Sequence, residues 1–332
     1  MKKIAFSILI LILLVFTISG CTYSAENYVF GTYYSVKIDA NNSYKLGKEI
    51  DTTLKEMDNA LSTNIIESDV TKINNSSASQ KVKVTTYTVE LFKISKELYA
   101  KTNHAFNPAS FPLTELWNFS PAKYTGIESS IPTQAEIESK LPYCNMDMFV
   151  LDEVEKTITK LNDNAKLDFG AIAKGYAADI VYNMSTENQS KRAIIDIGRT
   201  FKVLGDVDIY VANPREGDFV AKATINNQAV ATSGDYERYY IINNVRYHHI
   251  IDHTGYPAGL NVETPIISAT IVGESATICD ALSTATIVLG YQNVKPIIDA
   301  YGYSALLLTE TGYYTIGENL FEIQDQTRQK LN

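Results

Sequence analysis

The sequence predicts an α+β protein in which helices flank mixed and antiparallel sheets. Apolar residues recur at helical spacing in residues 43–62 and 88–103. No internal repeat, low-complexity segment or linker interrupts the chain, so we expect one domain over residues 28–332. Four β-branched and aromatic runs, each bounded by turn residues, are typical of strands. These runs occupy residues 192–197, 207–213, 220–225 and 238–242.

The first part of this domain is expected to contain a strand, two helices and a loop. Residues 28–40, "YVFGTYYSVKIDA", alternate as a strand does. Residues 104–132 are rich in Pro, Ser, Phe and Asn and predict an ordered loop. Thr133 with Glu136 forms a capping box that opens a short helix. The first helix has an apolar stripe made of Ile50, Leu54, Met57 and Leu61.

The N-terminus has the pattern of a bacterial lipoprotein leader. Lys2 and Lys3 precede an apolar run that is too short for a membrane span, and "ISGC" follows it. We therefore expect a signal peptide over residues 1–20, a lipid-modified Cys21 and a polar tether over 21–27. The alternative is an ordinary signal peptide that ends near a cysteine. The lipidated form would be an extracytoplasmic protein anchored to a membrane.

Composition excludes several functional classes. The net charge of −9 argues against a nucleic-acid partner, which requires a basic face. Hydrophobic residues make up 45% of the chain, enough for a core without disulfides. Cys144 and Cys279 could pair in an oxidising compartment, but two cysteines so far apart in the sequence form neither a disulfide framework nor a zinc pattern.

The stretch "KLDFGAIAKGYAADIV", residues 166–181, is a candidate phosphate site. We expect an apolar strand end, a turn containing glycine and a helix that starts with small residues. Such a helix start lets backbone N–H groups approach an anion, and Lys174 adds a full charge. Asp168 is suited to accept hydrogen bonds from a sugar or a base. The alternative is a glycine kept only for close packing.

A second candidate lies in "VGESATICDALSTATIVLG", residues 272–290, which predicts a helix. A second helix near 293–301 and two strands are expected to close the chain. Asp280 and Thr284 are four residues apart, so both oxygens face the same side of the helix. These polar residues indicate either a solvated face or a ligand-binding face.

Eight blocks in order resemble the ApbE-type FAD:protein FMN transferase family. In chain order they include "FGTYYSVKI", "HAFNPASFPLTELWNFS", "LDFGAIAKGYAADIV", "ATSGDYERYY", "YHHIIDHTGYPA" and "ICDALSTATIVLG". The resemblance implies a T-fold-like α+β fold. It also implies that FAD is the substrate and Mg²⁺ the cofactor. The FMN half would be transferred to a Thr or Ser hydroxyl of an acceptor flavoprotein, with release of AMP.

The same resemblance assigns site residues. Asp280, Thr284 and the backbone carbonyl of Ala171 would hold the metal, since Mg²⁺ prefers hard oxygen ligands. His249 would be the active-site histidine and, with Asp280, a catalytic residue, because a neutral imidazole is a suitable base near neutral pH. The FAD pocket would be lined by Phe30, Gly31, Thr32, Trp117, Asn118, Phe119, Asp168 and Lys174.

Four positions depart from the family pattern. Phe30 replaces a methionine and Asn64 an aromatic residue, while Arg199 stands where relatives have glycine. His253 lies in a turn that is one residue shorter than usual. A residue such as Arg199 would either fill space or contact a phosphate.

Three alternatives to the transferase remain open. Water in place of the acceptor hydroxyl would make the protein a pyrophosphatase that splits FAD into FMN and AMP. A non-catalytic lipoprotein would only bind FAD. The chain would itself be an acceptor if "DALSTAT", residues 280–286, were a flavinylation target.

Overall fold

A computed structural model describes residues 22–120, 123–126, 130–215 and 217–331. The expected signal peptide (1–20) and Cys21 lie outside these residues. In the described part of the chain, no helix has both the length and the apolar character needed to cross a membrane.

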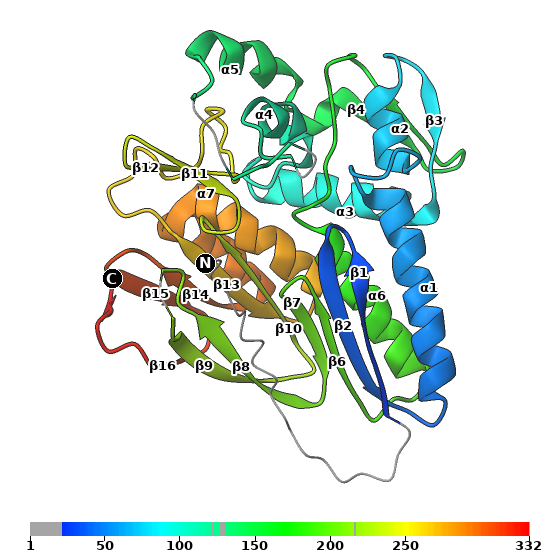
Figure 1. Cartoon of the computed structure of the whole chain (residues 1–332), viewed down its shortest axis with the longest axis vertical. Coiled ribbons are helices and arrows are strands. Elements are labelled where there is room, and N and C mark those ends of the chain that lie inside the picture. Colours follow the sequence, from blue (N-terminus) through cyan, green and yellow to red (C-terminus); the bar gives the residue numbers. More distant parts are fainter. Residues whose placement is uncertain (1–21, 121–122, 127–129, 216, 332) are drawn as a thin grey trace, which may run out of the picture.

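A nine-stranded sheet forms the centre of the molecule (Figure 1). Neighbouring strands pair antiparallel, except for a short parallel pair at one edge. In spatial order the strands are β1 (Thr22–Val29), β2 (Thr32–Asp39), β6 (Arg192–Ile197), β7 (Thr200–Leu204), β10 (Ala229–Gly234), β13 (Ser268–Gly273), β14 (Ser304–Leu308), β15 (Gly312–Ile316) and β17 (Gln329–Lys330).

Helices pack with this sheet to form the main hydrophobic core. They are α1 (Ser43–Leu61), α3 (Thr86–Lys101), α6 (Ala173–Glu187) and α7 (Ala276–Tyr301). α7 contains a non-helical break at Gly290, whose φ of 70° is in the left-handed region. A glycine adopts this conformation without steric cost, and the break divides α7 into the two helical segments expected from the sequence.

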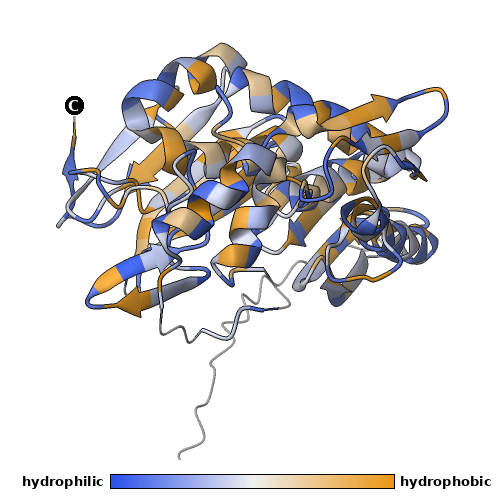
Figure 2. Ribbon diagram, turned by 90° about the horizontal axis from the view of Figure 1, so that it is seen from above, coloured by the Kyte–Doolittle hydropathy of each residue, from blue (hydrophilic) through white to orange (hydrophobic). Residues whose placement is uncertain are grey.

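A second core lies on the other face of the sheet. There a three-stranded sheet of β16 (Glu322–Ile323), β9 (Phe219–Asn226) and β8 (Asp206–Ala212) packs against Val203, Val272 and Leu306. Figure 2 shows the hydrophobic residues distributed along the strands, while the helices carry hydrophobic and hydrophilic residues side by side. The molecule therefore has three layers, with the central sheet between the helices and the smaller sheet.

Smaller elements lie beyond one end of the central sheet (Figure 1). One group consists of α2 (Asp69–Asn75) and the sheet β3 (Lys81–Lys83), β5 (Thr157–Lys160) and β4 (Phe149–Asp152). The other consists of α4 (Phe111–Leu116), α5 (Gln134–Lys140) and the hairpin β11 (Tyr239–Ile242) and β12 (Val245–His248). Three 3-10 turns connect them, at Pro108–Ser110, Leu141–Tyr143 and Met146–Met148.

The predicted α+β class and most predicted elements are confirmed. The apolar stripe of α1 is buried, and Thr133 and Glu136 form the expected capping box. Three expectations differ. Residues 22–27 are part of β1 instead of a tether, because Tyr23 packs on Gly47, where an added Cβ would lie 2.2 Å from the ring.

The other two differences concern loops. Residues 104–132 contain α4, which buries Phe111 and Leu113. The stretch before Gly170 forms no strand, because the side chain of Asn74, instead of a neighbouring strand, pairs with the backbone of Leu167 at 2.7 and 2.8 Å.

α6 and α7 are held together by an unusually close contact. A Cβ added to Gly175 would lie 2.2 Å from the carbonyl oxygen of Ala276 and 2.9 Å from Cβ of Asp280. One turn further along α6, the Asp179 carboxylate accepts hydrogen bonds from Ala276 N–H and Thr277 N–H, both at 2.9 Å. Asp179 thus caps α7 from the neighbouring helix and satisfies N–H groups that have no partner within α7.

This contact predicts that Gly175→Ala destabilises the protein by about 1–3 kcal/mol, because a methyl group there overpacks the helix pair. Denaturant unfolding of the purified protein measures the change. Asn183→Ala, on the exposed side of α6, is the matched control and should change stability by less than about 0.5 kcal/mol. Equal stability of the Gly175→Ala protein and the wild type would show that the helices do not depend on this contact.

Candidate functional site

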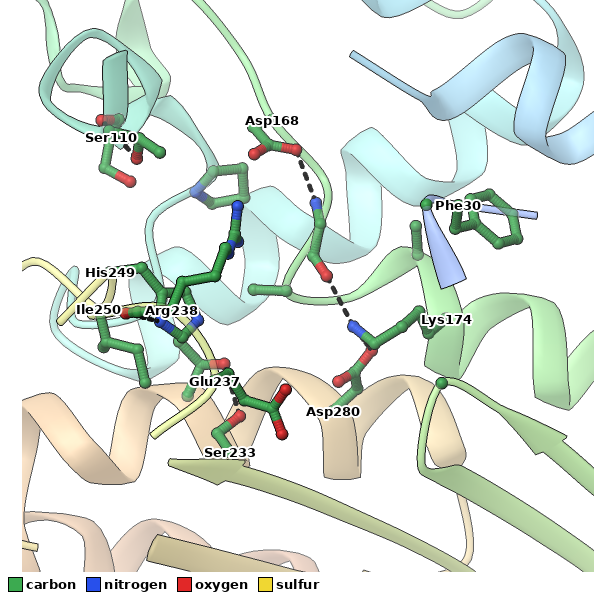
Figure 3. A pocket seen from close by; sticks show the side chains of 18 of the residues that line it. Phe30, Ser110, Asp168, Lys174, Ser233, Glu237, Arg238, His249, Ile250 and Asp280 are labelled. Carbon is green, nitrogen blue, oxygen red and sulfur yellow. Dashed lines mark hydrogen bonds and ion pairs between the residues drawn. The ribbon is translucent and has the colours of Figure 1, made fainter. Parts of the chain in front are cut away.

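A cavity of about 430 Å³ opens where the central sheet meets the smaller elements. The β1–β2 turn, the start of α6, the middle of α7 and the segment before β11 all contribute to it (Figure 3). Its lining includes Phe30, Gly31, Thr32, Asn64, Ser110, Asp168, Gly170, Ala171, Lys174, Ser233, Glu237, Arg238, His249, Asp280 and Thr284.

The Asp280 carboxylate is the buried acid of this cavity. Its Oδ2 accepts a hydrogen bond from Gly175 N–H at 3.0 Å and lies 3.4 Å from Lys174 Nζ. Lys174 Nζ also donates to the carbonyl of Gly170 at 2.8 Å. The ammonium group therefore bridges the turn before α6 and the acid on α7, as Figure 3 shows.

The hydroxyl groups beside Asp280 connect α7 to β10. Ser233 Oγ lies 2.7 Å from Ser283 Oγ and 3.0 Å from Thr284 Oγ1. Ser283 also donates to the carbonyl of Asp280 at 2.8 Å and is fully buried. Ser283 therefore packs between helix and strand, while Asp280 and Thr284 face the cavity.

These oxygen donors fit a magnesium ion that keeps part of its coordination for waters and substrate phosphates. Asp280, Thr284 and Ala171 line the same cavity, and a positively charged group already contacts Asp280 there. Within the described residues no group of three or more His, Cys, Asp or Glu side chains is suited to hold a metal.

The two adjacent histidines have different environments. His248 is buried, and both ring nitrogens are engaged: Nε2 with the carbonyl of Ala258 at 2.9 Å, and Nδ1 with Ile250 N–H at 3.3 Å. His249 lines the cavity, and its Nδ1 faces the carbonyl of Arg238 at 3.3 Å. Because a carbonyl only accepts, Nδ1 carries the proton, and the lone pair is on Nε2.

Charge and burial keep His249 neutral. Burial lowers its pKa well below the usual value, and the nearby Arg238 guanidinium lowers it further. Burial raises the pKa of Asp168, whose Oδ1 accepts a hydrogen bond from Gly170 N–H at 2.9 Å. Together with Lys174, Arg238 gives the cavity two cationic groups, which suit an anionic ligand.

Arg238 was not singled out from the sequence. It lies in the block "ATSGDYERYY", where a charged Glu-Arg pair interrupts a strand-like run. This interruption is the sequence feature that could have identified Arg238. Its guanidinium donates to the carbonyl of Phe119 at 2.5 Å, which fixes its position in the wall of the cavity. Glu237, beside it, also lines the cavity and pairs with Arg199 at 2.9 Å.

Trp117, Asn118 and Phe119, which the family resemblance places in the FAD pocket, directly follow α4. None of them lines the cavity. Trp117 and Phe119 belong to a separate cluster with Ile137 and Tyr240. Trp117 Nε1 donates to the carbonyl of Gly255 at 2.8 Å, and the carbonyl of Asn118 accepts from the Tyr240 hydroxyl at 2.9 Å. This triplet supports the cavity from behind, through the Phe119 carbonyl that holds Arg238.

The remaining expected residues meet at the β1–β2 turn. Phe30 (φ 53°) and Gly31 (φ 73°) form the turn and line the cavity with Thr32. Asn64 faces this turn, because a Cβ on Gly31 would lie 3.6 Å from its Nδ2. Arg199 also has a positive φ, of 70°, and its side chain points to Glu237 in solvent. A glycine at that position would adopt the same backbone conformation without strain.

Comparison with known proteins places the chain in a family. The sequence profile of the ApbE family matches residues 30–307. The chain belongs to the ApbE family. A relative from Klebsiella pneumoniae named FAD:protein FMN transferase is 29% identical, over 81% of this chain and 83% of its own length. A relative of the same name from Escherichia coli (strain K12) is 26% identical, over 86% and 84%.

Solved structures agree with this assignment. The crystal structure of the ApbE protein from Thermotoga maritima superposes with a TM-score of 0.78 and 29% sequence identity. The match covers 92% of this chain and 97% of that one. The ApbE flavin transferase from Vibrio cholerae shares the fold, with a TM-score of 0.75 over 91% of this chain and 96% of its own.

The position of Trp117 outside the cavity predicts that Trp117→Phe changes FAD affinity by less than about threefold. The same change should lower stability by about 1–3 kcal/mol, because the carbonyl of Gly255 loses its partner. Isothermal titration with FAD and denaturant unfolding measure the two effects. A tenfold loss of FAD affinity with unchanged stability would show that Trp117 contacts FAD.

Proposed function

We propose that this protein is an FAD:protein FMN transferase that moves the FMN half of FAD onto a Thr or Ser hydroxyl of an acceptor flavoprotein and releases AMP. One observation supports this most strongly. The cavity joins a small-residue helix start, two cationic side chains, a buried acid on α7 and a neutral histidine. Groups of these kinds can bind a pyrophosphate and accept the proton of an attacking hydroxyl. The two relatives described above are named FAD:protein FMN transferases.

The residues around Asp280 would hold Mg²⁺ through Asp280, Thr284 and the carbonyl of Ala171. The ion would neutralise the charge of the pyrophosphate and so make its phosphorus a better electrophile. Lys174 is the second residue of α6, where it is placed to bind a phosphate oxygen once it leaves Asp280. Arg238 supplies a second positive charge on the opposite wall.

His249 is suited to take the proton from the acceptor hydroxyl. The hydroxyl oxygen forms a bond to the phosphorus of FMN, and the bond from that phosphorus to the bridging oxygen breaks. AMP leaves with the bridging oxygen, and the hydroxyl proton moves to Nε2 of His249. The Nδ1 contact with the Arg238 carbonyl keeps the ring in the tautomer that this step needs.

The pKa of His249 predicts the pH dependence of transfer. Because burial lowers this pKa well below 6.5, the base form persists at pH 6.5, and the acidic limb of kcat should lie below that value. His249→Gln should reduce kcat by about 10²–10⁴-fold. The exposed His253→Gln is the control and should retain the wild-type profile. A wild-type acidic limb centred at or above pH 6.5 would contradict this role.

Asp280→Ala should abolish magnesium-dependent turnover and leave the fold intact, because a carboxylate is the strongest metal ligand in the cavity. Thr284→Ala should do less harm, since a neutral hydroxyl is a weaker ligand. The matched control is Asp208→Asn on β8, where the carboxylate contacts Lys222 and Thr224 far from the cavity.

The experiment combines the purified protein with FAD, Mg²⁺ and an acceptor domain, followed by mass measurement of both proteins and of the free nucleotides. An added FMN mass on the acceptor and equimolar AMP are expected. Undiminished AMP release by folded Asp280→Ala protein would refute the ligand assignment. Bound FAD with no AMP would identify a flavin-binding protein, and FMN on this chain would identify it as an acceptor.

One observation favours a second candidate, the hydrolysis of FAD to FMN and AMP. Thr63 and Asn64 line both the main cavity and an adjoining cavity of about 150 Å³, so the wall beside Asn64 is thin and polar. Free FMN in the same experiment, in place of flavinylated acceptor, would identify water as the nucleophile.

Asn64→Tyr should tighten FAD binding about ten- to a hundredfold, because a ring at this wall adds stacking of about 1–3 kcal/mol. Calorimetry measures the change. Asn183→Tyr, on the exposed side of α6, should have no effect. If FAD binds equally well to Asn64→Tyr and to the wild type, the flavin ring does not lie against this wall.

We also propose that residues 1–20 are a signal peptide and that Cys21 is acylated, so that a single catalytic domain is anchored outside the cytoplasmic membrane. The short apolar leader and "ISGC" support this. The fold described above then begins at the residue after the lipid.

A further inference from the structure

We infer that the end of the domain around the start of β1 is a membrane-docking face that lies on the bilayer. This face consists of Tyr23, Tyr44, Lys45, Lys48 and Lys191, and we call it the anchor face. The inference rests on the proposed acylation of Cys21, and its partner is the surface of an anionic lipid bilayer.

The first strand, β1, begins at Thr22, directly after the proposed lipid site at Cys21. Thr22 already pairs with Asp39 in the β1–β2 hairpin. One peptide unit, about 3.8 Å between Cα atoms, separates it from Cys21. An acyl chain on Cys21 therefore brings the start of β1 directly to the headgroups, with no tether to lift the domain away.

The second observation is what surrounds that point. Asp39 pairs with Arg192, and its carbonyl accepts from Lys191 N–H at 2.8 Å, so Lys191 lies beside the start of β1. Tyr23 contacts Tyr44 at the start of α1, with ring centroids 6.2 Å apart. Figure 1 shows the starts of β1 and α1 together at the same end of the molecule.

The chemistry of the anchor face matches a bilayer surface. Tyr44 is 69% exposed although it is a large aromatic residue, and exposed aromatic rings are enriched at the level of the headgroups. Lys48 Nζ lies 5.6 Å from the Tyr44 ring. Lys45, Lys48 and Lys191 are exposed, and basic side chains beside an anchor are attracted to anionic lipids. Acids also lie at this end of the molecule. Glu49 pairs with Lys45 at 3.6 Å, Asp39 is half-buried, and Glu187 at the end of α6 and Asp206 beside Arg192 are exposed.

This orientation also sets the distance of the cavity from the membrane. β1 has eight residues and leads directly to Phe30 in the cavity wall. At about 3.3 Å per residue the strand spans about 26 Å. With the anchor face on the bilayer, the cavity lies about one strand length from the lipid, and the acceptor hydroxyl must come within about 30 Å of the membrane.

The test uses the full chain, extracted from membranes and reconstituted into vesicles of brominated phosphatidylcholine and phosphatidylglycerol. Tyr44→Trp reports on the anchor face. Tyr28→Trp, 55% exposed and at the opposite end of the same hairpin, is the matched control. The buried Trp117 contributes the same background to both. Bromolipid quenching should be at least about twofold greater for Tyr44→Trp. Equal quenching, or greater quenching of Tyr28→Trp, would overturn the assignment.

Lys45→Gln/Lys48→Gln in the Tyr44→Trp background should lose at least about half of this additional quenching in the anionic vesicles. Unchanged quenching would show that the lysines do not contact lipid. The intact mass of the same sample reports the acylation of Cys21, and an unmodified mass would overturn the inference at its premise. FMN transfer measured in detergent is independent of all these results, so the failure of the docking face and the failure of the proposed activity are distinguishable.

Discussion

The close approach of α6 and α7 is the constraint on which the site depends. Gly175 provides the space for it, and Asp179 fixes it by capping α7 from α6. Because of this contact, the Asp280 carboxylate reaches the start of α6 and accepts a hydrogen bond from Gly175 N–H. The proposed phosphate-binding helix start and the proposed metal-binding acid therefore line one cavity. Neither element would bind a pyrophosphate well alone, since one supplies positive and the other negative charge.

The other side of the cavity is built by the smaller elements. The cluster of Trp117, Phe119 and Tyr240 packs behind the wall and holds Arg238 through the Phe119 carbonyl. Arg238 in turn contributes its backbone carbonyl to Nδ1 of His249. Its charge and the burial of the ring keep the imidazole neutral. The aromatic cluster thus positions Arg238 and His249 without lining the cavity itself.

Local sequence patterns predicted much of this arrangement, and long-range contacts account for what they missed. Asp280 and Thr284 are recognisable in the sequence because two oxygens one turn apart are unusual on an apolar helix, and the turn containing Gly170 before Lys174 is equally recognisable. The burial of Trp117 in a cluster apart from the cavity was not predictable, because its motif does not reveal whether the ring faces a cavity or a core. Arg238 and Asp179 were missed because their partners, Phe119 and the start of α7, lie about a hundred residues away in sequence. The strand at residues 22–27 was missed because Gly47, which accommodates Tyr23, lies in another element.

We propose that α6 and α7 together bind one metal ion, which in turn binds the phosphates of the substrate. Anomalous diffraction from crystals grown with Mn²⁺ and ADP tests it most directly. We expect one anomalous peak about 2.0–2.3 Å from an Asp280 carboxylate oxygen, near Thr284 Oγ1 and the carbonyl of Ala171, with Lys174 Nζ moved from Asp280 to a phosphate. A peak elsewhere in the cavity, with Lys174 still paired to Asp280, would contradict the account.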